Sequence, residues 1–435
     1  MKNLCRIIQK NGTVTALFPM FVAIIMNISC FISTAFCAEN DIIFTLHKQI
    51  IINEHGFYRT TMEYPRLILY GNKPPLVSYV DNREQKAYFT EINDDGPKIL
   101  ATLPMSDVFS MEMLHNNSDK NYFSTAKLID YYGANRSEQI MLFLFDRENK
   151  KISLQKEYNI KISGKGKKGD IDIGLYPFKG KFLVFGGYEE TYFHPLGFIL
   201  GGHMLTGMKH FSAILDNSET VQSWPIDEEG RYHNSDWRES LSEAGTVQVA
   251  GVREKAKYSH SDETICYSES EDGMHWKKPM QIYTLKEEER KIHSIRNLSM
   301  VEYKGKVFIF WRITEKGEYL AEIEGDKVKK IEQISDTKRE QLPINDPVGI
   351  TPAILAVDQQ GNLYVLSVVN SAPKRYRMFL KARTNGEWTK EAVISEDTAN
   401  FAQSVDLKVD SNGIIHIAYY LGFGRASYYM KVTRN

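Results

Sequence analysis

Short runs that alternate apolar and polar residues fill most of the chain, and they are rich in Ile, Val, Phe and Tyr. Gly, Asn and Asp residues interrupt the runs, which is the pattern of β-strands joined by tight turns. Helical periodicity is confined to two short polar stretches, Asp236 to Ala244 and Leu285 to Ile295. The pattern therefore predicts an all-β protein.

One hairpin pattern recurs along the chain, most clearly in Ala353 to Val369 and Val405 to Tyr420. Their turn glycines, Gly361 and Gly413, are 52 residues apart (413 minus 361). Glycine suits such turns because it adopts a positive φ without steric cost. The same hairpin recurs in Leu298 to Arg312, in Gly174 to Tyr188 and, more loosely, in Arg66 to Val80.

A second hairpin with a polar turn stands between the copies, as in Arg377 to Ile394. Each unit thus holds about four strands, the content of one propeller blade. The predicted units are Arg66 to Ala101, Val108 to Tyr158, Asp170 to Trp224, Asp236 to Tyr283, Leu298 to Ile334, Ala353 to Ile394 and Val405 to Thr433.

The last unit has only three strands, and the strand Ile42 to Ile52 can supply the missing outer one. That pairing would close the ring and remove a free sheet edge. We therefore predict a β-propeller of seven four-stranded blades closed by an N-terminal strand, with six blades as the alternative. A stack of β-sandwiches would not repeat one hairpin at a near-constant interval.

The first 37 residues have the composition of a secretory signal peptide. Lys2, Arg6 and Lys10 precede the apolar run LFPMFVAIIMNI, and the small residues Ala35 and Cys37 precede a cleavage position. We predict residues 1–37 as the signal peptide and 38–435 as one propeller domain, secreted or periplasmic, with no stable membrane insertion after cleavage. The alternative is an uncleaved N-terminal anchor, because residues 17–37 could just span a bilayer.

Composition narrows the functional classes. Fifty-four basic residues oppose 55 acidic residues, for a net charge of −1, so nothing points to a nucleic-acid partner. Cleavage would remove three cations, leaving 51 minus 55, or −4. The mature chain would keep one cysteine, Cys266, so it could form no internal disulfide and would rely on its hydrophobic core.

One segment, Tyr267 to Ile282, carries a sharper motif: Ser270, Asp272, Gly273 and Trp276 in the order Ser-x-Asp-Gly-x-x-Trp. It resembles the Asp-box, or BNR repeat, of sialidases and their relatives. We expect Asp272 to bond the backbone of its own turn, Gly273 to permit that turn and Trp276 to pack between blades. In that family the box is structural and lies on the face away from the site.

In a propeller, the second strand of each blade ends at the mouth of the central channel. Three units place arginine near this position: Arg83, Arg253 and Arg312. Arginine keeps its charge and can grip a carboxylate through two hydrogen bonds. The other units place Glu189, Asn370, Tyr420 and Asp130 there, with Asp81 just before Arg83.

This set resembles a sialidase site, where three arginines hold the sugar carboxylate. By that resemblance the catalytic candidates are Tyr420 as nucleophile, Glu189 beside it and Asp81 as acid and base. The plainer interpretation is that the arginines are solvated, or pair with neighbours such as Glu84 and Glu254.

Other candidate chemistry is sparse. His194, His203 and His210 have no compact metal-binding spacing, and a loop covering the third unit is the preferred interpretation. Trp237, in the loop Arg231 to Ser240, could stack on a ligand or simply anchor that loop. Phosphate loops, zinc-binding cysteine pairs and serine-nucleophile elbows do not occur in the sequence. We expect neither a cofactor nor a metal.

Two functional hypotheses follow. The first is a sialidase-like propeller that binds an acidic glycan or another carboxylate-bearing ligand in an axial arginine-lined pocket, with or without exo-glycosidase activity. The second is a non-catalytic scaffold for another protein. Arginines that share one pocket would favour the first, and arginines that each pair with a local acid would favour the second. We expect a monomer in either case.

Overall fold

The computed structural model divides the chain by its contacts into residues 1–43 and 44–435, and the description below concerns the second unit. The predicted signal peptide and the first two residues of the predicted closing strand lie outside the described residues. The described residues are 44–53, 65–81, 84–104, 110–113, 120–128, 135–163, 167–193, 204–215, 221–223, 237–241, 245–254, 262–335, 353–372, 375–395, 402–421 and 426–434.

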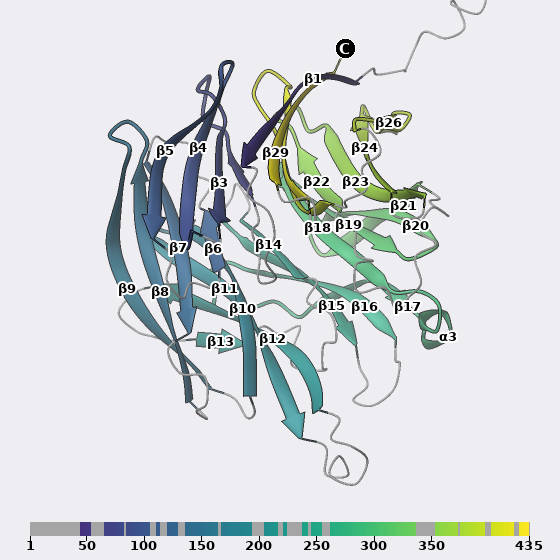
Figure 1. Cartoon of the computed structure of the whole chain (residues 1–435). Coiled ribbons are helices and arrows are strands. Elements are labelled where there is room, and N and C mark those ends of the chain that lie inside the picture. Colours follow the sequence, from purple (N-terminus) through teal and green to yellow (C-terminus); the bar gives the residue numbers. More distant parts are fainter. Residues whose placement is uncertain are drawn as a thin grey trace, which may run out of the picture. The chain divides into compact units, whose positions relative to one another are not determined.

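The described strands form seven separate antiparallel sheets, which we number in chain order (Figure 1). Within sheets 1 to 5 the strands follow one another along the chain as a meander. Sheet 1 contains β2 (Arg66–Ile68), β3 (Leu76–Asp81), β4 (Lys86–Asn93) and β5 (Gly96–Pro104). Sheet 2 contains β6 (Ser110–Met113), β7 (Lys120–Leu128), β8 (Asn135–Asp146) and β9 (Lys151–Ser163). Sheet 3 contains β10 (Lys167–Phe178), β11 (Lys181–Phe193), β12 (Met204–Leu215) and β13 (Val221–Ser223).

Sheets 4 and 5 repeat this order, sheet 6 has one additional strand, and sheet 7 takes its outer strand from the N-terminal side of the described chain. Sheet 4 contains β14 (Trp237–Leu241), β15 (Val247–Glu254), β16 (Glu263–Ser270) and β17 (Met280–Leu285). Sheet 5 contains β18 (Ile295–Tyr303), β19 (Lys306–Ile313), β20 (Gly317–Glu324) and β21 (Lys327–Ser335). Sheet 6 contains β22 (Ala353–Val357), β23 (Leu363–Ala372), β24 (Arg375–Thr384), β25 (Glu387–Trp388) and β26 (Ala392–Val393). Sheet 7 contains β27 (Ala402–Val409), β28 (Ile415–Leu421), β29 (Ala426–Arg434) and β1 (Phe44–Asn53).

Sheet 7 is therefore completed by a strand from the other end of the described chain. β1 pairs with β29 in antiparallel register, from Phe44 opposite Arg434 to Asn53 opposite Ser427. The expected pairing of this N-terminal strand is confirmed. The closure of all the sheets into one propeller, and its number of blades, stay predictions.

Apolar side chains from successive sheets meet in shared clusters. Sheet 1 packs on sheet 2, sheet 3 on sheet 4, sheet 4 on sheet 5, sheet 5 on sheet 6 and sheet 6 on sheet 7. The rings of Tyr122 in sheet 2 and Phe182 in sheet 3 have their centroids 5.0 Å apart. Sheet 7 also packs on sheet 1, in a cluster that includes Ile50 and Tyr429 on one side and Leu67 and Tyr79 on the other.

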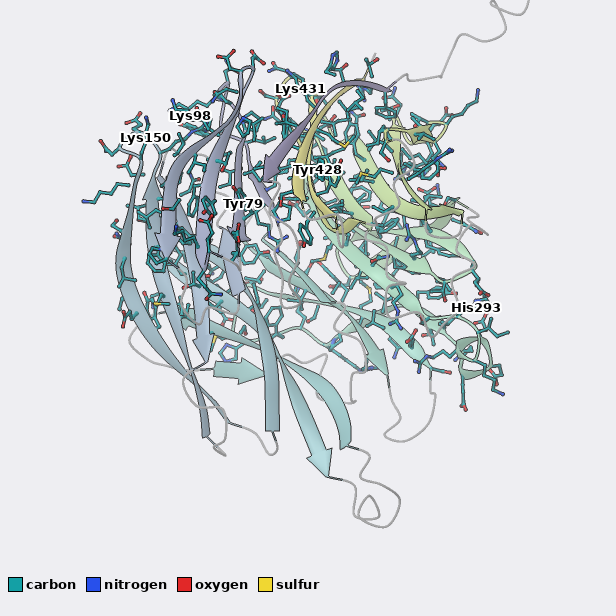
Figure 2. All side chains as sticks on the ribbon, viewed as in Figure 1. Tyr79, Lys98, Lys150, His293, Tyr428 and Lys431 are labelled. Carbon is teal, nitrogen blue, oxygen red and sulfur yellow. The ribbon has the colours of Figure 1, made fainter. Side chains whose placement is uncertain are left out.

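In three sheets, two aromatic residues that are register partners on the second and third strands stack on each other. In each sheet they lie two positions before the last register partners of that hairpin. The ring centroids are 5.2 Å apart for Tyr79 and Tyr88, 5.1 Å for Tyr419 and Tyr428, and 5.8 Å for Trp311 and Tyr319. Figure 2 marks Tyr79 in sheet 1 and Tyr428 in sheet 7. Each pair packs against the preceding sheet, so these rings help to fix how neighbouring sheets meet.

The two hairpins that repeat most clearly in the sequence also repeat in their hydrogen bonds. In sheet 6, Asp358 Oδ1 accepts from the backbone N–H of Gln360 at 2.9 Å and of Asn362 at 2.8 Å. In sheet 7, Asp410 Oδ1 accepts from Asn412 at 2.9 Å and from Ile414 at 2.8 Å. The glycines that follow, Gly361 and Gly413, have φ values of 87° and 76°. The prediction of glycine turns with positive φ is thus confirmed at both positions.

The two helical predictions had different outcomes. α3 spans only Glu287–Arg290, within the predicted stretch Leu285 to Ile295. The prediction for Asp236 to Ala244 is wrong, because Trp237–Leu241 forms β14 and pairs with β15. A short polar helix is marginal on its own, and the ladder with β15 satisfies this backbone instead. Within the described residues, no helix has the length and apolarity needed to cross a membrane.

Candidate functional site

In a four-stranded antiparallel sheet, the loop between the second and third strands lies at one end of the sheet. The fourth strand finishes at that same end, so the chain also crosses to the next sheet there. Four predicted site residues with described side chains lie at this end. Asp81 is the last residue of β3, while Arg253, Arg312 and Tyr420 are the penultimate residues of β15, β19 and β28. These four residues thus lie within one residue of the end of their second strands.

The other candidates differ from expectation or lie outside the described residues. Glu189 is not at a strand end, because the ladder of β11 with β12 continues to Phe193 opposite Met204. Trp237 is not in a loop, because it begins β14 and pairs with Gly251. His210 lies in β12. The remaining candidates, Arg83, Asp130, His194 and His203, lie outside the described residues.

Arg312 points from sheet 5 toward sheet 6 and is almost fully buried, with 2% exposure. Its Nη2 donates to Glu318 Oε1 at 2.7 Å, and its Nη1 donates to the carbonyl of Val368 in β23 at 3.3 Å. Ser367 and Ser335 donate to the same carboxylate at 2.5 and 2.9 Å. Burial alone would raise the pKa of Glu318, but the charge of Arg312 and these hydrogen bonds hold the pKa below its ordinary value.

Arg253 is also buried, at 3% exposure, but it lies on the opposite face of its sheet from the face that Arg312 occupies. In β15, Val252 packs on sheet 5, whereas Val247 and Val249, which share the face of Arg253, pack on sheet 3. Side chains alternate between the two faces of a sheet along each strand, so a shift of one residue moves a side chain to the other face.

Asp81 and Tyr420 lie in the junction of sheets 7 and 1. Asp81 shares a face of β3 with Tyr79, and Tyr420 shares a face of β28 with Ala418; both faces contribute to the same apolar cluster. Asp81 is 6% exposed, and its Oδ1 accepts from the backbone N–H of Glu84 at 3.2 Å. Two of the three catalytic candidates are therefore on facing sides of one junction.

A tyrosine–glutamate pair beside Asp81 was missed in the sequence. The hydroxyl of Tyr88 donates to Glu84 Oε2, and Lys86 Nζ lies 3.3 Å from the same oxygen. Burial and the Glu84 carboxylate both raise the pKa of Tyr88. The signal available in the sequence was the hairpin register, which places Tyr88 opposite Tyr79 and leaves Glu84 in the intervening turn. Chemically, this carboxylate accepts a hydrogen bond from a phenol that keeps its proton at neutral pH.

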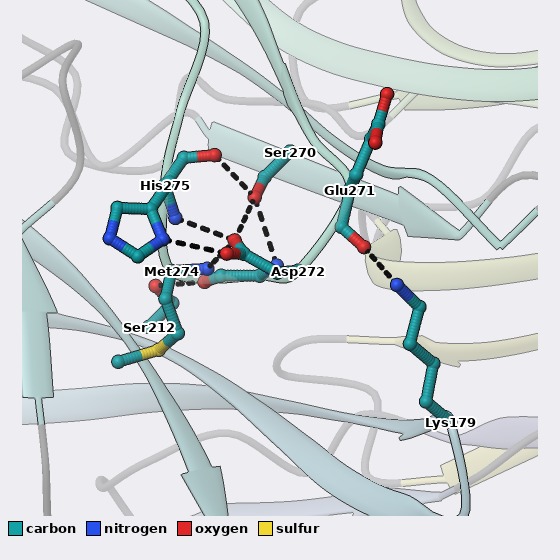
Figure 3. Close-up of polar contacts among 8 residues, drawn as sticks. Lys179, Ser212, Ser270, Glu271, Asp272, Met274 and His275 are labelled. Atoms are coloured by element: carbon teal, nitrogen blue, oxygen red, sulfur yellow. Dashed lines mark hydrogen bonds and ion pairs between the residues drawn. The ribbon is translucent and has the colours of Figure 1, made fainter.

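The motif that resembles an Asp-box forms a compact turn between β16 and β17 (Figure 3). Asp272 Oδ1 accepts from the backbone N–H of Met274 at 2.9 Å and of His275 at 2.7 Å, and Gly273 has a φ of 76°. Burial would raise the pKa of Asp272, but these bonds and those from the His275 and Ser270 side chains lower it. The predicted roles of the turn aspartate and glycine are confirmed.

The same turn joins sheet 4 to sheet 3. The carbonyl of Gly273 accepts from Ser212 Oγ at 2.8 Å, and the carbonyl of Glu271 accepts from Lys179 Nζ at 2.6 Å (Figure 3). Trp276 packs with Phe185 and other apolar residues of both sheets, as expected. The turn lies at the opposite end of its sheet from the second-strand ends, so its chemistry is that of a structural joint. Within the described part of the chain, no group of three His, Cys, Asp or Glu residues is arranged to hold a metal ion.

Comparisons with known proteins give structural likeness alone. No family model matches the chain, and no curated protein matches it. A protein of unknown function from Dyadobacter fermentans is 11% identical with a TM-score of 0.46, over 90% of this chain and 99% of that one. An alpha-L-arabinanase from Penicillium chrysogenum is 10% identical with a TM-score of 0.43, over 90% and 98%. A sialidase from Trypanosoma rangeli, in complex with sialic acid, is 8% identical with a TM-score of 0.39, over 90% and 58%.

The structural neighbours thus include enzymes of the superfamily that the sequence motif resembles. At these identities and TM-scores the likeness establishes neither a family nor an activity for this chain.

Proposed function

We propose that this protein is an exported, sialidase-like β-propeller of seven blades that binds an acidic glycan or another carboxylate-bearing ligand. The seven sheets would be the blades, and β1 would complete the last one. The ligand would lie at the end of the propeller where the second strands finish, held by Arg83, Arg253 and Arg312 with Trp237 at its edge. If the ligand is hydrolysed, the catalytic groups would be Tyr420 as nucleophile, Glu189 beside it and Asp81 as acid and base.

One observation carries the proposal: buried ionisable side chains recur at the end of the second strand in different sheets. The exposed fraction is no more than 6% for each of Arg253, Arg312 and Asp81. Charged residues are seldom buried to this extent unless they are paired. Burial of arginine is costly through desolvation, and an anion beside the guanidinium offsets that cost, as the Glu318 carboxylate does for Arg312. Arginine also matches the geometry of a carboxylate.

Binding of defined sugars tests the proposal. Calorimetric titration of the mature chain should detect sialic acid and not galactose, which lacks a carboxylate. Arg253→Ala should weaken sialic acid binding by about tenfold or more, because a charge-assisted hydrogen bond contributes ~1.5–3 kcal/mol. The control is Lys329→Ala, which removes an exposed cation on the outer strand β21 and should leave binding unchanged. Equal binding of both sugars, or of neither, would contradict an acidic-sugar pocket.

Hydrolysis is tested separately from binding. Tyr420→Phe keeps the ring and removes the hydroxyl, so it should abolish release of a fluorescent aglycone from a sialoside and barely change affinity. A chain that binds sialic acid but releases no aglycone from this sialoside, even before substitution, would be a lectin-like binder.

A scaffold for another protein is the second candidate, and the contacts of Arg312 favour it. Glu318 and the Val368 carbonyl already accept from this guanidinium inside the protein. On this hypothesis Arg312→Ala would mainly lower stability, by about 3–5 kcal/mol, because it leaves a buried carboxylate without its cation. The paired variant Arg312→Met with Glu318→Gln removes both charges and should restore most of that stability. If that stable variant retains full sialic acid affinity, Arg312 is structural.

Export is part of the proposal and has its own test. Mass spectrometry of the protein from the exported fraction should find a new N-terminus near Ala38, as the charged start and apolar run of the chain predict. Recovery of intact Met1 in membranes would favour the N-terminal anchor.

A further inference from the structure

The imidazole of His416 connects three parts of sheet 7. His416 lies in β28 and is 5% exposed. Its Nδ1 is 2.7 Å from the hydroxyl of Tyr429 in β29, and its Nε2 is 3.3 Å from Oδ2 of Asp410, in the turn before β28. A carboxylate can only accept, so Nε2 carries the proton and Nδ1 accepts from Tyr429. The neutral ring therefore satisfies both neighbours at once.

Tyr429 links this contact to the joint between the two ends of the described chain. Its ring belongs to the apolar cluster in which sheet 7 packs on sheet 1, together with Ile50 of β1. Tyr429 is also the register partner of Ile50. A change at the imidazole thus acts on the strand that β1 pairs with.

The surroundings of His416 oppose a positive charge on the ring. Burial lowers the pKa of His416, Asp410 acts in the opposite direction, and Lys431 lowers the pKa further. Lys408 in β27 and Lys431 in β29 are the register partners of His416 on its two sides. The titratable and charged groups around His416 are Asp410, Tyr429, Lys408 and Lys431. Asp94 of sheet 1 faces Tyr429.

The matching hairpin of sheet 6 supplies an internal comparison. Asp358 occupies the place of Asp410, and the residue six positions later is Tyr364, whose hydroxyl donates to Asp358 Oδ2 at 3.0 Å. Burial raises the pKa of Tyr364, so this contact does not titrate near neutral pH. The same turn is therefore built once with a tyrosine and once with a histidine.

We propose that His416 is an acid-sensitive latch that holds sheet 7 to β1 and sheet 1. When a proton from solvent binds Nδ1, that nitrogen becomes a donor, so the Tyr429 hydroxyl has to turn and accept from it, and a buried cation is left between two lysines. The buried charge and the turned hydroxyl weaken the packing of β29, and the joint between sheets 7 and 1 loosens.

The direction of the pH effect follows from the two states of the histidine. The unfolded chain binds the proton near the ordinary pKa of 6.5, and the folded chain binds it only at lower pH. The contribution to stability is complete above about pH 6.5 and is lost as the pH falls from there toward the folded pKa. Across that window the ratio of folded to unfolded protein should fall by up to tenfold per pH unit, or about 1.4 kcal/mol.

Denaturant unfolding of the mature chain between pH 5 and pH 8 tests this. His416→Tyr installs the residue found at this place in the sheet 6 hairpin. The number of protons bound on unfolding, read from the slope of unfolding free energy against pH, should fall by up to one. The matched control is Tyr364→Phe, which removes the corresponding contact with Asp358 in sheet 6 and should keep the wild-type pH dependence, because Tyr364 does not titrate near neutral pH. The reciprocal Tyr364→His should add acid sensitivity to sheet 6.

A second measurement needs no variant to fold. The ring resonances of His416 in the wild-type chain, followed by NMR, should titrate clearly below pH 6.5, together with a change at Tyr429. Titration at or above pH 6.5, or an unchanged pH dependence in a folded His416→Tyr chain, would overturn the latch.

Discussion

Sheets 6 and 7 contain the same hairpin but are completed in different ways. Their turns agree bond for bond, with Asp358 and Asp410 each accepting from the second and fourth backbone N–H that follow. Sheet 6 takes its outer strands, β25 and β26, from the chain that immediately follows. Sheet 7 takes its outer strand, β1, from more than 350 residues earlier in the chain. The repeat thus determines the local turn, and a long-range pairing supplies the outer strand of sheet 7.

The largest expected effect follows from removing that long-range strand. A chain that begins after Glu54 lacks β1, exposes the edge of β29 and loses the burial of Ile50 and Ile52. Burial of two isoleucines contributes up to about 3–6 kcal/mol, and the ladder of β1 with β29 is lost as well. Thermal melting should show a strong loss of stability. A chain that begins at Ala38 is the control, and equal melting of the two chains would contradict a structural role for β1.

Single substitutions within β1 separate its buried and exposed contacts. Ile50→Ala should cost about 2–4 kcal/mol, because Ile50 is 9% exposed and packs between sheets 7 and 1. His47→Ala removes an exposed contact with Thr433 on the same pair of strands and should cost less than about 1 kcal/mol. Urea unfolding of both variants measures the difference. Equal costs would mean that β1 is held by its surface and not by the junction.

The twin glycines give the sharpest comparison of the two hairpins. Both have positive φ, so alanine at either position should cost about 1–2 kcal/mol in backbone strain. A Cβ at position 361 would also lie 2.4 Å from the ring of Tyr303 in sheet 5, whereas position 413 has open space. Gly361→Ala should therefore lower the unfolding free energy by at least about 1 kcal/mol more than Gly413→Ala. The reverse order would show that the contact between sheets 5 and 6 at this turn is loose.

Much of the fold could be predicted from the sequence because its signals are local. The hairpin turns rest on Asp and Gly residues a few positions apart, and the boundaries of the repeated units follow from those turns. Asp272 and Gly273 show the same logic, since their roles depend on neighbours in their own turn. Trp237 was misplaced because its strand is defined by a partner, β15, and not by its own periodicity.

The candidate site was harder because it depends on which face of a sheet a residue occupies. Arg253 and Arg312 hold the same place near the strand end, yet they point into different junctions, and only the packing of their neighbours reveals this. The partner of Arg312, Glu318, lies on the next strand and becomes visible only once the register of the two strands is known. Residues separated by a junction, such as Asp81 and Tyr420, carry no local signal of their proximity.

Hydrogen exchange of the intact mature chain tests most directly whether β1 is an integral part of sheet 7 and lets the fold close there. The amides of Phe44–Asn53 that bond to β29 should exchange as slowly as the amides of β28, because both should open only when the whole domain unfolds. Fast exchange of β1, with β28 still protected, would show that sheet 7 stands without its N-terminal strand and that the chain does not close there.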